Sequence, residues 1–184
     1  MKRGTNQLWL LILVWLSVAT VQAAEVMPPA PANHFNDYAH VVSTQTAQEL
    51  NQTLEDFEKN SSDQVVVAVF QKMESPSSLE DYVQRIFVNW KIGLKDKNNG
   101  VLLVVFVQEH RLRIHVGYGR ESVLPDARAK QIIENDITPR FKRNDYDGGL
   151  RAGVLAVLQS IRGEYKGTGR TVAQNRYRGP DPTW

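Results

Sequence analysis

The sequence predicts an α/β fold, a three-layer α/β/α sandwich built on a small mixed sheet of three or four strands. Two observations carry this prediction. Continuous apolar runs at Val65–Phe70 and Val101–Val107 are typical of strands buried on both faces. Segments whose apolar residues repeat at helical spacing lie before, between and after these runs. Two strands joined through a helix form a β-α-β unit, so we expect them to run parallel with a right-handed crossover.

Two helices are predicted in the first half of the chain. Ser43 can cap one helix, whose apolar stripe consists of Ala47, Leu50, Leu54 and Phe57. Ser77 and Glu80 form an S-x-x-E capping box that opens the next helix. Gly93 is expected to end that helix in the left-handed conformation. The stripe of this second helix consists of Leu79, Val83, Ile86, Phe87 and Trp90.

Two more helices are predicted in the second half. Pro125 suits the first turn of one of them, and Pro139 should interrupt it. Its stripe is Ile132, Ile133 and Ile137. Either Asn144 or Asp145 can cap the last helix. The stripe of the last helix consists of Leu150, Val154, Val157, Leu158 and Ile161.

The segment from Asn98 to Ala127 carries the only site-like arrangement in the chain. Arg111–Val116 alternates apolar and polar residues, as an edge strand antiparallel to Val101–Val107 would. In such a hairpin the start of the first strand and the end of the second lie together. Four oxygen-bearing side chains should therefore converge there: Asn98, Asn99, Glu121 and Asp126.

This cluster predicts a site for a hard divalent cation, Ca²⁺ or Mg²⁺, which prefers carboxylate, amide and carbonyl oxygens. Asp37 is a further candidate ligand, because six extended residues span about 20 Å and can bring it to the same end of the sheet. The alternative is that each residue acts locally. Asn98 and Asn99 suit a turn, Asp126 suits a helix N-terminus, and Glu121 can be solvated.

The N-terminus predicts a secretory signal peptide over residues 1–23. Lys2 and Arg3 precede an apolar run from Leu8 to Val21, and small residues around Ala23 suit cleavage after that position. The alternative is an uncleaved membrane anchor, although the run is shorter than the roughly 20 residues of a spanning helix. No second apolar stretch of that length follows, so the processed protein is expected to lack a membrane span and to be periplasmic or secreted.

Three segments follow the signal. Residues 24–33 are rich in proline and read as an extended tether. Residues 34–165 form the predicted domain. Residues 166–184 show no periodicity and read as a flexible basic tail.

Composition excludes some classes of protein. The chain has no cysteine, so the domain must be stable without disulfides. Removing Lys2 and Arg3 from the 22 basic residues leaves 20, against 20 acidic ones, so the processed chain is neutral. A nucleic-acid binder would need a clustered basic face, and the predicted domain has none.

Motifs for nucleophilic or zinc chemistry are missing. There is no G-x-S-x-G motif and no phosphate-cradling loop, and Gly117-Tyr118-Gly119 is too short for a dinucleotide fingerprint. The four histidines fall at no zinc-binding spacing: His34, His40, His110 and His115.

Over residues 34 to 165 the chain resembles the TPM-domain family. Four segments carry the resemblance: Phe35–Ala39 with Val42-Ser43, Trp90–Gly93 with Asn99–Leu103, Arg113–Glu121 with Leu124–Ala127, and Tyr146–Leu150. The sequence departs from the family pattern in two places. Asn98 replaces a usual Asp, which removes a negative charge, and Pro125 replaces a common Thr, which removes a hydroxyl cap.

The resemblance implies a TPM-domain-like α/β/α sandwich, export or a lumenal location, and an acidic crevice that takes divalent cations. For a chloroplast member it implies acid phosphatase activity and a role in photosystem repair. The crevice would be lined by Gly117, Tyr118, Gly119 and Arg120. Tyr118 is the better surface candidate, since Trp90 lies in a helix stripe and should be core.

Two functions are therefore carried forward. The preferred one is a divalent-cation-binding accessory or protein-binding module of the cell envelope, acting on an envelope protein partner. The alternative is a phosphatase of low activity at the same crevice, in which Arg113 and Arg120 would hold phosphate oxygens. The favoured alternative is that both arginines are surface residues that only aid solubility. The sequence offers no nucleophile or base that would identify an enzyme.

Overall fold

The computed structural model describes residues 25–165 and 184. The predicted signal peptide and all but the last residue of the predicted tail lie outside this part, and both stay predictions. In the described part the strands are β1 (Phe35–Asp37), β2 (Gln64–Phe70), β3 (Gly100–Phe106) and β4 (Arg111–Val116). The helices are α2 (Thr44–Ser61), α3 (Leu79–Trp90), α4 (Asp126–Ile132), α5 (Thr138–Phe141) and α6 (Tyr146–Ile161). A short 3₁₀ turn, η2 (Tyr118–Arg120), follows β4, and a π-helix, η3 (Ile133–Ile137), joins α4 to α5.

The sheet is mixed and has the order β1-β2-β3-β4. β1, β2 and β3 run parallel, and β4 pairs with β3 in the antiparallel direction. The parallel β2-α3-β3 unit and the β3-β4 hairpin confirm the two pairings predicted from the sequence. β1 is the additional strand. It has only three residues, too few to give a periodic pattern in the sequence.

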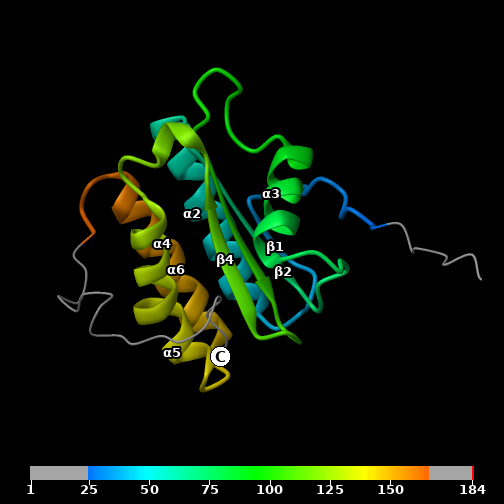
Figure 1. The fold of residues 1–184 in the computed structure, drawn as a ribbon. Coiled ribbons are helices and arrows are strands. Elements are labelled where there is room, and N and C mark those ends of the chain that lie inside the picture. The colour runs from blue at the N-terminus through cyan, green and yellow to red at the C-terminus, as the bar shows by residue number, and fades with distance from the viewer. Residues whose placement is uncertain (1–24, 166–183) are drawn as a thin grey trace, which may run out of the picture.

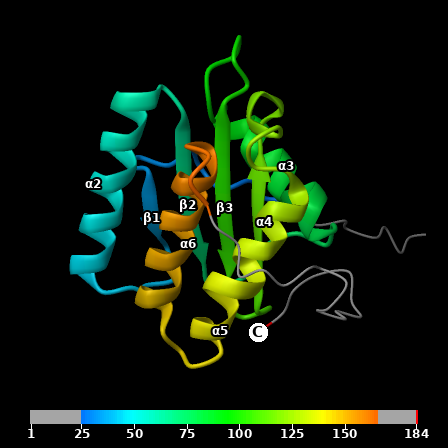
Figure 2. The same cartoon turned by 90° about the vertical axis from the view of Figure 1, so that its left-hand side faces the viewer.

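Helices cover both faces of the sheet, which confirms the three-layer α/β/α sandwich (Figures 1 and 2). α3 alone covers one face, while α2, α4, α5 and α6 cover the other. Because side chains alternate along a strand, β2 sends Val65, Val67 and Val69 to the four-helix face and Val66 and Ala68 to α3. Two separate cores result.

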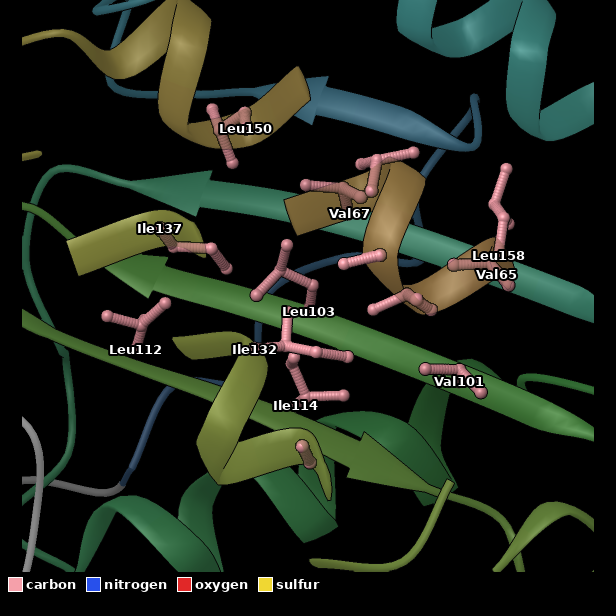
Figure 3. Packing of buried hydrophobic residues seen from close by; sticks show 14 of the residues in the cluster. Val65, Val67, Val101, Leu103, Leu112, Ile114, Ile132, Ile137, Leu150 and Leu158 are labelled. Carbon is pink, nitrogen blue, oxygen red and sulfur yellow. The ribbon is translucent and has the colours of Figure 1, made fainter. Parts of the chain in front are cut away.

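The larger core lies between the sheet and the four helices (Figure 3). Val67 and Leu103 from neighbouring strands meet Ile137 and Leu150 from the helices, and all are almost fully buried. Burying side chains of this size contributes about 1.5–3 kcal/mol each. This core therefore supplies the stability that a chain without cysteines needs.

The helix termini agree with the predicted caps except around α3. Ser43 caps α2 and Asp145 caps α6. The cap of α3 is Ser78, not Ser77, because the Ser78 hydroxyl accepts the Asp81 N–H. α3 ends at Trp90, and its C-cap, Lys91, is itself left-handed, two residues before the predicted Gly93. Gly93 also has a positive φ of 88°, so two left-handed residues turn the chain here.

Residues 25–33, which belong to the predicted tether, have no regular secondary structure and lie against α3 (Figure 1). Their contacts are described below. Of the described residues, none belongs to a helix that is both long and apolar enough to cross a bilayer.

Candidate functional site

The β3-β4 hairpin brings together the segments in which the sequence places a site. Val101 pairs with Val116, so Asn98–Gly100 lies beside Gly117–Arg120. The Gly117 N–H donates to the Gly100 carbonyl at 2.8 Å, and the Gly119 N–H donates to the Asn98 carbonyl at 2.9 Å. The turn after β4 is therefore fixed to the loop before β3 by backbone hydrogen bonds.

Glycine is required at this junction because backbone packs on backbone. A Cβ atom on Gly119 would lie 2.0 Å from the Lys97 carbonyl oxygen, and one on Gly117 would lie 2.4 Å from that of Asn98. Neither oxygen belongs to a flexible side chain that can move away. The glycine-rich motif therefore serves close contact between two loops.

Asn99 has a structural place in this junction. It is fully buried, and its Oδ1 atom accepts the Leu94 N–H at 2.9 Å. Its amide nitrogen donates to the Ser62 carbonyl and, at 3.1 Å, to the Asp63 carboxylate. Asn98 turns the chain beside it in a left-handed conformation, with φ of 46°. The turn at Asn98 is the local role that the sequence left as the alternative to metal ligation, whereas the Asn99 side chain binds Ser62 and Asp63, which are distant in sequence.

Asp63, which sequence reasoning did not single out, is the buried charge of the site. Its side chain is 5% exposed and pairs with the guanidinium of Arg120, whose Nε donates to Oδ1 at 2.8 Å. Arg120 thus ties the turn after β4 to the residue before β2. In sequence, Asp63 stands alone ahead of an apolar run, and nothing there indicates a partner 57 residues later.

Glu121 and Asp126 are the carboxylates of the predicted cluster that remain accessible. Both are exposed, and within the described residues neither accepts a hydrogen bond or forms an ion pair. Tyr118, 81% exposed, stands on the turn just before them. The negative charge of Asp126 also favours the protonated form of His115 in β4 and by itself would raise the pKa of His115. Burial and the nearby Arg113 outweigh this effect and lower the pKa of His115.

Asp37 lies at the other end of the sheet. It pairs with Val69 in the β1-β2 register, whereas Gly100 pairs with Gln64 at the opposite end of β2. The separation is five strand residues, roughly 16 Å at about 3.3 Å per residue. The Asp37 carboxylate instead accepts the N–H groups of Ala39 and Val42, at 3.1 and 2.8 Å. The expectation that it reaches the other four residues is therefore wrong, because β1 runs parallel to β2 and Asp37 lies at its carboxyl end, away from Gly100.

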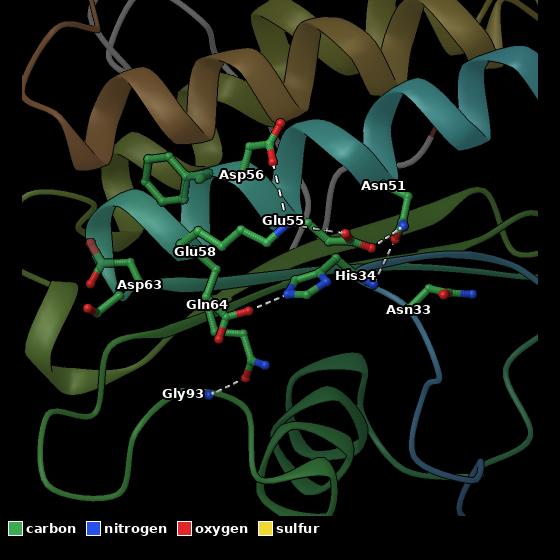
Figure 4. A network of polar contacts seen from close by, with 12 residues as sticks. Asn33, His34, Asn51, Glu55, Asp56, Glu58, Asp63, Gln64 and Gly93 are labelled. Atoms are coloured by element: carbon green, nitrogen blue, oxygen red, sulfur yellow. Dashed lines mark hydrogen bonds and ion pairs between the residues drawn. The ribbon is translucent and has the colours of Figure 1, made fainter.

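A second polar network lies along α2, near the start of β2 (Figure 4). The His34 imidazole is hydrogen-bonded to the Glu58 carboxylate, and the Asn51 side chain accepts the backbone N–H of His34 at 2.9 Å. Gln64 accepts the Gly93 N–H at 2.7 Å and so joins β2 to the loop before β3. These contacts fix the elements that carry the candidate site.

The two arginines proposed to hold phosphate both have carboxylate partners. Arg120 pairs with Asp63, and Arg113 lies 3.4 Å from Glu80 of α3. Among residues 25–165 and 184, no three His, Asp or Glu side chains are grouped closely enough to hold a metal ion by themselves. A cation at Glu121 and Asp126 would therefore depend on backbone carbonyls and water for its other ligands.

Comparison with known proteins decides the family. A model of the TPM domain matches residues 35–160. The chain belongs to the TPM domain family. Most of the candidate site lies inside this TPM domain, including Asp63, Asn99, Arg120, Glu121 and Asp126. No curated protein matches the chain.

Solved structures agree with the TPM fold. The chain is similar to the N-terminal domain of a protein from P. gingivalis, with 29% identity over 75% of this chain and 87% of that one, at a TM-score of 0.66. It is also similar to BA42 from the psychrophilic bacterium Bizionia argentinensis, with 20% identity over 72% of this chain and 89% of that one, at a TM-score of 0.53. An N-terminal domain from Corynebacterium glutamicum has 14% identity, 79% and 90% coverage, and a TM-score of 0.52. The last two show the fold alone.

Proposed function

We propose that this TPM domain is an exported accessory or protein-binding module of the cell envelope that binds a divalent cation, Ca²⁺ or Mg²⁺. The proposal depends on the two accessible carboxylates, Glu121 and Asp126. Among the described residues neither carboxylate has a hydrogen-bond or ion-pair partner. Both follow the turn in which Gly117 and Gly119 pack against the loop before β3. Asn98 is the third candidate ligand.

The donor set fits a weak site for a hard cation. Two carboxylates and an amide leave several positions for carbonyl groups and water, which Ca²⁺ and Mg²⁺ both accept. Asp63 adds no free charge because Arg120 neutralises it. We therefore expect a dissociation constant on the order of 10⁻⁴–10⁻³ M, as in extracellular calcium modules.

Phosphatase activity at the same crevice is the alternative. It would need a positive group to hold phosphate oxygens and a base to activate water. Arg113 and Arg120 already have carboxylate partners, Glu80 and Asp63 respectively. The binding module is therefore the preferred proposal, and the enzyme is left to a direct assay.

One titration separates these possibilities. CaCl₂ and MgCl₂ are added to the labelled protein while backbone amide shifts are followed, and a generic phosphomonoester is assayed in the same sample. Saturable shifts confined to residues 117–127, without turnover, support the module. Cation-dependent turnover that Asp126→Asn abolishes supports the phosphatase. Shifts spread over the surface, or none up to about 10 mM, contradict both.

Matched variants sharpen the titration. Glu121→Gln and Asp126→Asn should each weaken cation binding about tenfold, because each removes one charge from the ligand set. Glu109→Gln is the control, since Glu109 is also exposed but lies in the turn at the other end of the β3-β4 hairpin. An equal loss in Glu109→Gln would show only unspecific screening.

Export is tested by the N-terminus of the protein recovered from cells. Cleavage after Ala23 would leave Ala24 as the first residue. An intact Leu8–Val21 run in a membrane fraction would instead support the anchored alternative.

A further inference from the structure

Residues 25–33 form a proline-rich arm that α3 recognises by specific contacts. The Tyr82 hydroxyl donates to the Val26 carbonyl at 3.2 Å, and the Trp90 indole N–H donates to the Pro28 carbonyl at 3.0 Å. Two alternate carbonyls of the arm, those of Val26 and Pro28, thus accept hydrogen bonds from aromatic side chains. A free tether would need neither contact.

An ion pair fixes the start of the arm. Arg85 donates from Nε to one Glu25 carboxylate oxygen at 3.0 Å and from Nη2 to the other at 2.6 Å. The hydroxyl of Ser75 also donates to this carboxylate, and Ser77 accepts from Arg85 at 2.7 Å. A bidentate arginine binds a carboxylate in one orientation, so the surface of α3 around Arg85 is specific for an acidic residue.

These contacts are of the kind by which proteins bind extended proline-rich segments. An extended proline-rich segment has no internal hydrogen bonds, so its carbonyls are free, and its ordering entropy is low. Protein surfaces that bind such segments use aromatic rings as the floor and aromatic N–H and O–H groups as donors. Tyr82 and Trp90 supply both, and Arg85 adds selectivity for charge.

A groove of about 680 Å³ continues from the arm. Val26–Pro29 forms one wall, and the floor is a row of rings at the carboxyl ends of β1, β2 and β3. Tyr38 stacks on Phe70 with centroids 5.1 Å apart, and Phe70 stacks on Phe106 at 5.7 Å. Flat rings of this kind suit prolyl and aliphatic side chains.

We propose that α3 and this groove form a recognition site for an extended, proline-rich segment with an acidic residue ahead of its prolines. The chain's own arm occupies part of the site in cis, and the partner is another envelope protein that presents such a segment and displaces the arm. The contacts of the arm support this specificity, because α3 binds the segment E-V-M-P-P through the charge of Glu25 and through backbone carbonyls. The inference rests on the proposed function for the envelope location of the partner, and not on the cation site, since Glu121 and Asp126 take no part in these contacts.

A peptide of residues 24–32, A-E-V-M-P-P-A-P-A, with a fluorescent label, is the probe. The purified chain is compared with Glu25→Lys, in which the arm loses its ion pair to Arg85. A segment attached in cis competes at an effective concentration of about millimolar. We therefore expect the peptide to bind Glu25→Lys at least tenfold more tightly than the unaltered chain. Pro28→Gly with Pro29→Gly is a second arm-released variant that leaves α3 unchanged.

Charge reversal provides the control. Arg85→Glu alone also releases the arm, because its new negative charge repels Glu25. This variant should not bind the acidic peptide and should favour a peptide carrying Glu25→Lys. Well-dispersed amide spectra establish that each variant is folded. Equal binding to the unaltered and released chains, or no binding to either folded released variant, overturns the proposal. Arm-dependent dimers abolished by Arg85→Glu would assign the site to a second copy and overturn the partner assignment.

Discussion

Arg120 and Asp63 form an ion pair across the end of the sheet, with the Arg120 Nε atom 2.8 Å from Asp63 Oδ1. Asp63 precedes β2 and is almost completely buried, whereas Arg120 ends the turn after β4 and keeps about a third of its side chain exposed. Asn99 gives the same carboxylate a second donor at 3.1 Å. One buried charge therefore holds together three segments around the candidate site.

Replacing Arg120 should destabilise the domain. Arg120→Met keeps the aliphatic contacts but leaves the Asp63 carboxylate buried with Asn99 as its remaining side-chain partner. Breaking a buried pair costs about 3–5 kcal/mol, and the partial exposure of Arg120 reduces this to about 2 kcal/mol. Urea denaturation at neutral pH measures the free energy of unfolding.

Arg113 provides the matched control. It also pairs with a carboxylate, but Glu80 is 42% exposed and water can solvate it. Arg113→Met should therefore change the free energy of unfolding by less than about 1 kcal/mol. Equal losses in the two variants would contradict the distinction between a buried and an exposed acid. Adding Asp63→Asn to Arg120→Met should recover part of the loss.

Gly119 should tolerate no side chain, although its backbone conformation is ordinary. In Gly119→Ala the new Cβ would sit 2.0 Å from the Lys97 carbonyl, so the loop before β3 or the turn after β4 must move. We expect a loss of more than about 2 kcal/mol, within the range for overpacking, and reduced cation-dependent shifts at Glu121. Thermal unfolding and the amide titration measure the two effects.

Gly163→Ala is the control that distinguishes a steric clash from backbone strain as the cause of lost stability. It has φ of 76°, and nothing lies within 4 Å of a built Cβ. Gly163→Ala should lose about 1–2 kcal/mol through backbone strain alone. It should leave the spectrum of residues 117–127 unchanged. A Gly119→Ala variant no less stable than Gly163→Ala would mean that the loop has room to adapt.

Periodicity and caps determined most of the fold in advance. The β-branched runs at 65–70 and 101–106 are buried on both faces, so they appear as continuous apolar sequence. Ser43 and Asp145 are local signals that depend on residues within one turn. β1 was not located because three residues, one of them pointing into a polar contact, carry no period.

The site was less accessible to sequence reasoning, since its contacts are tertiary. The hairpin register follows from adjacent strands, and it correctly brings Asn98 beside Gly117–Arg120. The position of Asp37 is not predictable in this way, because the segment from β1 to α2 does not run back along the sheet. The Asp37 carboxylate accepts the Val42 N–H and stays at the carboxyl end of β1. The docked arm has the sequence of a tether because its partners lie far along the chain: Arg85 is 60 residues from Glu25, and Trp90 is 62 residues from Pro28.

His115 should make stability depend on pH near neutrality. Burial, with Arg113 adding to it, lowers the pKa of His115 in the folded state below its ordinary value of about 6.5. As the pH falls below about 6.5, the unfolded chain takes up a proton that the folded chain still excludes, so the free energy of unfolding decreases. Above that pH the imidazole is neutral in both states and the effect vanishes.

His115→Gln should remove this dependence. The melting temperature of the unaltered protein should fall relative to that of His115→Gln between pH 7.5 and pH 5. Asp126→Asn should lower the pKa of His115 further, because the Asp126 carboxylate favours the protonated ring. The imidazole proton shifts give that pKa directly. Parallel melting curves across this range would show that His115 titrates alike in both states.

Tyr165 should ionise only at strongly alkaline pH. Burial, together with the hydrogen bond that its hydroxyl donates to Asp136 at 3.0 Å, raises the pKa of Tyr165 to about 12. The unfolded phenol ionises near pH 10, so between pH 10 and 12 the unfolded state loses a proton that the folded state retains. The contribution of Tyr165 to stability is therefore complete below pH 10 and declines as the pH rises to about 12.

Asp136→Asn tests the cause of this shift. Removing the carboxylate charge should bring the pKa of Tyr165 part of the way back towards 10, while burial keeps it above that value. Tyrosine ¹³Cζ shifts follow the titration of each ring. Asp147→Asn is the control, because Asp147 lies in α6 and accepts hydrogen bonds from Ser43 instead. If the pKa of Tyr165 is unchanged in Asp136→Asn, or changes equally in both variants, then the hydrogen bond to Asp136 of the π-helix is not a cause of the raised pKa.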